Sequence, residues 1–161
     1  SVALEREGEL MAGVVYNPAT DELFHAEKGR GAFMNDRRLR VAERRDLHDC
    51  VIATGMPFFG KKGHAQFLKE LHQIMPMTAG VRRYGAASLD LAWTAAGRFD
   101  GFWERNLKSW DIAAGLVLVR EAGGFAGAID PGTDVLETGH IAAGNERVIK
   151  ELREMLAKAA S

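Results

Sequence analysis

Two carboxylates, Glu104 and Asp111, have the types and the spacing to do chemistry together. Glu104 ends FDGFWE, an apolar segment typical of a strand, and Asp111 lies near the start of WDIAAGLVLVREAGG, whose apolar residues recur at helical spacing. A short loop between such elements returns both side chains to one edge of a sheet, where α/β proteins commonly bind ligands. We therefore expect both acids to face one pocket, where the Asp111 carboxylate is free to bind a hard cation such as Mg²⁺.

Each acid also has a purely structural explanation. Asp111 in the first turn of a helix would interact favourably with the helix dipole, by roughly 0.3–1 kcal/mol at a surface, and Ser109 would be the N-cap. Glu104 would be a solvated strand end with Arg105 as its charge partner. These residues alone leave the structural and the functional interpretations open.

The strand-to-helix junction YGAAS, residues 84–88, would offer backbone groups rather than side chains to a ligand. Gly85, Ala86 and Ala87 are small enough for a ligand to approach the main chain, and N–H groups at a helix N-terminus bind anions or hydroxyl-rich molecules. Small residues equally suit close packing of a helix on a sheet. The five histidines and Cys50 lack zinc-ligand spacing, so we expect no metal role for them.

The elements that position these residues predict a layered α/β (α+β) fold. Residues 1–45 have the alternation and turn residues of an antiparallel strand meander, whereas residues 46–161 alternate short apolar runs with helical periods, as in a C-terminal α/β domain. In this second part we expect strands at CVIATG, VRRYG, FDGFWE, FAGAID and HIAAG and helices at 64–75, 88–96, 110–121 and 145–159.

Composition narrows the class of protein. The 161 residues are 47% hydrophobic and 27% charged, with a net charge of -1, which provides no general attraction for nucleic acid or an anionic membrane. No apolar run approaches the roughly 18 residues of a membrane span, and a single cysteine suits the reducing cytoplasm, where we expect the protein to be located. Ser1 leads directly into strand-like sequence without an initiator Met, so we expect a longer parent protein.

The segment WDIAAGLVLVREAGG closely resembles the signature W-D-x-A-A-G-x-x-L-V-x-E-A-G-G of the inositol monophosphatase family. GVVYNP, VIATG, RRYGAASLDLAWTAAGRFDGFWE and IAAGNE follow the family pattern in the same order, and the bacterial SuhB-type members are the most similar. The resemblance implies the αβαβα sandwich of the inositol monophosphatase/fructose-1,6-bisphosphatase type, of which this chain would be the C-terminal part. Such proteins are usually homodimers.

The activity implied by the resemblance is Mg²⁺-dependent, lithium-sensitive hydrolysis of inositol monophosphate. By matching positions, Asp111 would be a catalytic residue that binds the metal and contacts the substrate. Glu104 would hydrogen-bond inositol hydroxyls, and Gly85, Ala86 and Ala87 would line the substrate pocket. A metal-activated water would then attack phosphorus in line with the leaving oxygen.

The chain departs from the family where most of the metal ligands should be. The motifs D-P-[ILV]-D-G-T and G-E-[ET] do not occur, and the resemblance covers about three-fifths of a typical member. Because Mg²⁺ needs several oxygen ligands, we expect the chain to be inactive alone. The alternatives are hydrolysis of another ester, such as fructose 1,6-bisphosphate or a nucleotide, and a SuhB-like role with the transcription or ribosomal-RNA processing machinery, through the basic residues 37–45.

Overall fold

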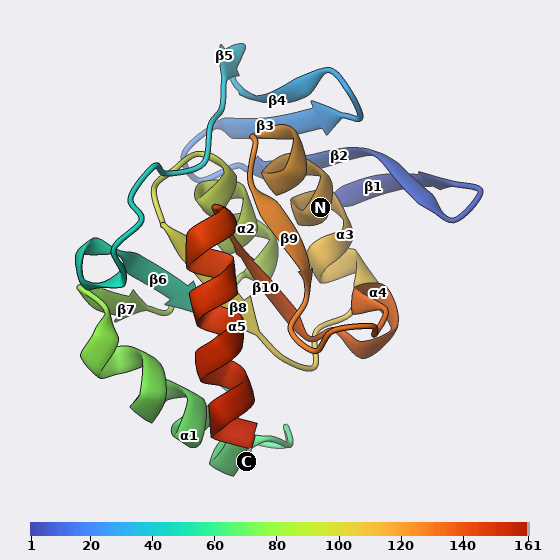
Figure 1. Cartoon of the computed structure of the whole chain (residues 1–161). Coiled ribbons are helices and arrows are strands. Elements are labelled where there is room, and N and C mark those ends of the chain that lie inside the picture. Colours follow the sequence, from blue (N-terminus) through green and yellow to red (C-terminus); the bar gives the residue numbers. More distant parts are fainter. Residues whose placement is uncertain (161) are drawn as a thin grey trace.

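The computed structural model describes residues 1–160 and contains two five-stranded sheets (Figure 1). The first sheet is an antiparallel meander in the order β1-β2-β3-β4-β5. Its first hairpin turns at Glu7 and Gly8, which have φ angles of 55° and 78°, as a two-residue turn between twisted strands requires. The strands are β1 (Val2–Arg6), β2 (Glu9–Asn17), β3 (Glu22–Glu27), β4 (Gly31–Met34) and β5 (Arg37–Arg38).

The second sheet is mixed and has the order β7-β6-β8-β10-β9. Strands β7, β6 and β8 run parallel to one another, while β10 is antiparallel to both β8 and β9. The carboxyl ends of the three parallel strands therefore meet at one edge. The strands are β6 (Val51–Thr54), β7 (Gly80–Arg82), β8 (Gly101–Glu104), β9 (Phe125–Ala128) and β10 (Ile141–Gly144).

Helices cover both faces of the second sheet. Helices α2 (Ala87–Ala95) and α3 (Ser109–Glu121) pack between the two sheets, and α1 (His64–Ile74) and α5 (Glu146–Ala160) pack together on the other side (Figure 1). A single-turn helix, α4 (Val135–Thr138), precedes β10, and short 3-10 helices span Leu47–Asp49 and Met75–Met77. The order of layers is sheet, helices, sheet, helices.

Helix α3 is buried on almost every side because it lies between the sheets. Its segment from Ala114 to Val119 is buried throughout, so the expectation of one apolar face was too narrow. Close approach explains the small residues: a Cβ atom on Gly13 of β2 would lie 2.7 Å from the carbonyl oxygen of Ala114. A Cβ on Gly115 would lie 2.5 Å from a methyl carbon of Leu91, so α2 approaches just as closely.

The predicted α/β layering is confirmed, and each long helix begins and ends within one residue of its predicted limits. Helix α4 was missed because four residues are too few for a helical period to show. The boundary near residue 45 stays a prediction, since one apolar core joins Phe24 of the first sheet to Phe102 of the second. Among residues 1–160, no helix has both the length and the apolar character needed to cross a membrane.

Candidate active site

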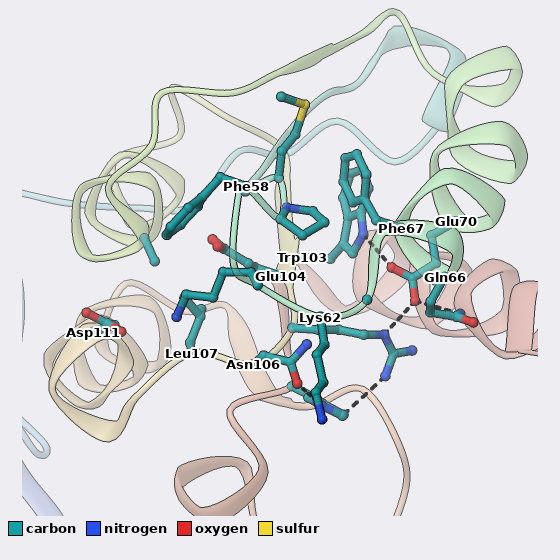
Figure 2. Close-up of a pocket in the computed structure, with 18 of the residues that line it drawn as sticks. Phe58, Lys62, Gln66, Phe67, Glu70, Trp103, Glu104, Asn106, Leu107 and Asp111 are labelled. Carbon is teal, nitrogen blue, oxygen red and sulfur yellow. Dashed lines mark hydrogen bonds and ion pairs between the residues drawn. The ribbon is translucent and has the colours of Figure 1, made fainter.

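A cavity of about 740 Å³ opens at the carboxyl ends of β6, β7 and β8. All five residues singled out from the sequence line this cavity. The structure therefore brings the two junctions together at one pocket, as predicted. Figure 2 shows Glu104 and Asp111 on neighbouring elements, with Phe58 and Leu107 close to them. The five are Gly85, Ala86, Ala87, Glu104 and Asp111.

Asp111 lies in the first turn of α3 and has one carboxylate oxygen engaged. Its Oδ2 accepts a hydrogen bond from the backbone N–H of Lys108 at 2.9 Å. Lys108 is the N-cap and Ser109 is already helical, so the assignment of Ser109 as the cap was wrong. Within residues 1–160 the other oxygen accepts no hydrogen bond, which leaves it available to a ligand of the cavity.

Glu104 is half-buried and has neither a hydrogen bond nor an ion pair with any described residue. Burial, followed by repulsion from Asp90 and Asp111, raises the pKa of Glu104 to about 7. The expected charge partner, Arg105, pairs instead with Glu70 and Asp130. A carboxyl group with its pKa near neutrality can donate a hydrogen bond when protonated and accept one when ionised.

Asp90 on α2 is a buried acid that the sequence analysis did not single out. Its side chain is 0% exposed, and neither oxygen has a hydrogen-bond partner among residues 1–160. Burial raises the pKa of Asp90 to about 7. A clue was present in the sequence, since Asp90 is the one acid in the otherwise apolar helical run SLDLAWTAA.

The opposite end of the cavity holds a hydrogen-bonded network around Glu70 of α1, which is 1% exposed. Glu70 accepts hydrogen bonds from Trp103 Nε1 at 3.2 Å, from Gln66 Nε2 at 3.0 Å and from Arg105 Nε. Arg105 also contacts His140 Nδ1 at 3.2 Å (Figure 2). Sequence reasoning missed this network because its members come from separate elements.

The junction before α2 presents main chain to the cavity. Gly85 has a φ of 92°, which glycine adopts readily, and Ala86 is the extended N-cap that precedes the helix. No side chain caps α2, so the N–H groups of its first turn remain free for a ligand. Such groups favour an anion or a hydroxyl oxygen.

The described residues do not form a complete magnesium site. No group of three or more His, Cys, Asp or Glu side chains within residues 1–160 is arranged to hold a metal ion. Mg²⁺ prefers a nearly octahedral set of oxygen ligands. Asp111 can supply one of these oxygen ligands, which is a small part of the set.

Comparison with known proteins identifies the family of the chain. The model of the inositol monophosphatase family matches residues 1–161. An inositol-1-monophosphatase of Rhizobium meliloti (strain 1021) is 58% identical over 97% of this chain, and the Nus factor SuhB of Pseudomonas aeruginosa is 46% identical over 94% of it. The solved structure of the extragenic suppressor protein SuhB from Bartonella henselae is 55% identical over 97% of the chain, with a TM-score of 0.93.

The chain spans only part of these relatives. It covers 59% of the length of the Rhizobium protein, 57% of the Pseudomonas protein and 60% of the Bartonella structure. The match extends through both sheets and all the residues of the cavity. This chain belongs to the inositol monophosphatase family.

Proposed function

We propose that this chain is the substrate-binding portion of a Mg²⁺-dependent phosphatase that hydrolyses inositol 1-phosphate. The observation that carries the proposal is the pair of incompletely bonded carboxylates, Glu104 and Asp111, in one cavity with the uncapped start of α2. Substrate hydroxyls would bond to Glu104, and the N–H groups of the first turn of α2 would meet the polar oxygens of the ligand. The name of the Rhizobium meliloti relative supports the choice of substrate.

Asp111 would contribute one carboxylate oxygen to the metal. The remaining ligands must come from outside the described residues, because those residues hold no metal-binding cluster. We therefore expect the 161-residue polypeptide to release no phosphate by itself. Lithium sensitivity, a homodimeric assembly and a cytoplasmic location are further expectations for the whole protein.

A hybrid protein tests the proposal. The part of the Rhizobium meliloti relative that this chain does not match would be joined ahead of residue 1, and phosphate release from inositol 1-phosphate would be measured with and without Mg²⁺. The proposal expects Mg²⁺-dependent turnover by the hybrid, none by the chain alone, and loss of turnover with Asp111→Asn. Full activity of the Asp111→Asn hybrid would contradict it.

The same assay decides between esters. Fructose 1,6-bisphosphate and a nucleoside monophosphate would replace inositol 1-phosphate at equal concentration. The proposal expects the largest kcat/KM for inositol 1-phosphate, the ester that the name of the Rhizobium meliloti relative indicates. A larger value for either alternative would move the substrate assignment to that ester.

A second candidate function is association with the transcription machinery. The supporting observation is the similarity to the Pseudomonas aeruginosa Nus factor SuhB. Arg37 and Arg38, which form β5 of the first sheet, and the nearby Arg40 are exposed and form the candidate surface. A pull-down of transcription complexes with these three arginines changed to glutamate tests it, and undiminished association would exclude this surface.

A further inference from the structure

Gly55 directly follows β6 and lies beside Glu104. The parallel register of β6 and β8 pairs Thr54 with Trp103, so the next residues along the two strands are neighbours. The hydroxyl of Thr54, which is 1% exposed, donates a hydrogen bond to the carbonyl oxygen of Trp103 at 2.8 Å. This buried bond fixes the register at the point where both strands enter the cavity.

The carboxyl group of Glu104 occupies the space that a side chain at residue 55 would need. A Cβ atom built on Gly55 would lie 2.0 Å from both Cδ and Oε1 of Glu104 and 2.3 Å from Oε2. These separations are far inside van der Waals contact. Gly55 is buried and is not among the glycines with positive φ, so its backbone conformation does not itself require glycine.

We propose that Gly55 is a positioning residue for substrate recognition: its lack of a side chain lets the Glu104 carboxyl lie against the end of β6, where it meets the substrate hydroxyls. The inference rests on the proposed substrate-binding role of Glu104.

The backbone on either side of Glu104 cannot easily move away from an added methyl group. Trp103 is 0% exposed, and its indole N–H is bonded to Glu70. Arg105 is bonded to the same carboxylate. Because both neighbours are held by one buried acid, a side chain at residue 55 would displace the Glu104 side chain rather than the strand.

The direct test is a double-mutant cycle in the 161-residue chain. Gly55→Ala, Glu104→Ala and the double variant would be compared by urea unfolding. We expect Gly55→Ala to lower the unfolding midpoint when Glu104 is present and not when Glu104 is alanine, since the overlapping atoms are then gone. If the single variant fails to fold, recovery of folding in the double variant supports the proposal, and failure of both overturns it.

Gly127→Ala is the matched control. Gly127 lies within β9 and, like Gly55, has no positive φ, and its added Cβ would meet only the guanidinium end of Arg153 at 3.4 Å. Its effect on the midpoint should be the same with and without the Glu104 side chain. An equal dependence of the Gly55 and Gly127 variants on Glu104 would overturn the proposal.

The kinetic test uses the active hybrid. Gly55→Ala and Glu104→Ala should each raise the KM for inositol 1-phosphate about tenfold, and the double variant should be no worse than either. Gly127→Ala should leave KM unchanged. An unchanged KM for Gly55→Ala in a hybrid whose KM depends on Glu104 would overturn the positioning role. A hybrid without phosphatase activity would refute the proposed function instead, and the unfolding cycle would still decide whether Gly55 positions Glu104.

Discussion

Two buried acids, Glu70 in the lining of the cavity and Asp90 on α2, have opposite surroundings. Glu70 is 1% exposed and accepts hydrogen bonds from three side chains, whereas Asp90 is 0% exposed and accepts none within the described part of the chain. A buried carboxylate with donors belongs to the framework, while one without donors disfavours the folded state when it ionises. We call the part of the cavity around the bonded Glu70 its rigid end. Asp90 belongs with the unbonded acids near Glu104, whose pKa it raises, and we call that part the free end.

The free end of the cavity is lined by Glu104 and Asp111. Repulsion among Asp90, Glu104 and Asp111 adds to burial in raising the pKa of Glu104. Arg83 and Lys61 offset only part of this effect, so the pKa of Glu104 remains raised. Carboxylates with raised pKa values recur at functional sites. We infer that the rigid end keeps the free end in place.

Replacement of Glu70 should have the largest effect on stability. Glu70→Ala would leave the indole N–H of Trp103 and part of the Arg105 guanidinium buried without an acceptor, at a cost of about 3 kcal/mol. Urea unfolding measures the loss. The exposed Glu154 serves as control, since Glu154→Ala should change stability by less than about 0.5 kcal/mol. Equal effects of the two variants would show that the network does not stabilise the fold.

Asp90→Asn should instead increase the stability of the fold. Because the pKa of Asp90 rises from 3.8 to about 7 on folding, the native state holds its proton more tightly, and wild-type stability falls as pH rises across this range. Asparagine removes that cost, so the variant should be more stable by about 2 kcal/mol at pH 8 and should lose this advantage below pH 4. Unfolding at both pH values measures the difference. An advantage independent of pH would contradict the ionisation argument.

Glu104→Gln should also increase stability at high pH, but by less than Asp90→Asn does. The pKa of Glu104 rises from 4.5 to about 7, but the side chain is half-buried and solvent reduces the cost of its charge. We expect a gain of about 1 kcal/mol at pH 8 that fades toward pH 4.5. Chemical unfolding of both variants would show which of them gains more stability. A larger gain for Glu104→Gln than for Asp90→Asn would contradict the expected order.

Asp111→Asn should have the smallest effect on the fold. An amide oxygen can still accept the N–H of Lys108, so the main loss is the favourable charge at the start of α3, worth less than about 1 kcal/mol. Thermal unfolding of the chain measures this loss. A loss as large as that of Glu70→Ala would mean that Asp111 is mainly structural.

Much of the fold was predictable because local patterns express it. Helical spacing located α3, strand alternation located β2, and the junction before α2 was recognised from its small residues. The free acids Glu104 and Asp111 were also found, since Glu104 ends one apolar segment and Asp111 lies near the start of the next.

The rigid end and the position of Gly55 could not be found in this way. Glu70, Trp103 and Arg105 meet only when α1 packs beside β8, and the sequence contains no local sign of that contact. In the sequence Gly55 has no feature beyond its place after a predicted strand, and only the register with β8 shows which side chain fills its space. Long-range packing, not local propensity, determines both features.

The central claim is that the free acid Glu104 binds substrate while the bonded acids hold the framework. The most direct measurement is the KM of the hybrid for inositol 1-phosphate with Glu104→Gln, compared with Glu154→Gln. The account predicts a KM raised about tenfold for the first variant and unchanged for the second, because loss of one well-placed polar contact costs about 1.4 kcal/mol. Equal KM values for both variants and the parent hybrid would contradict it.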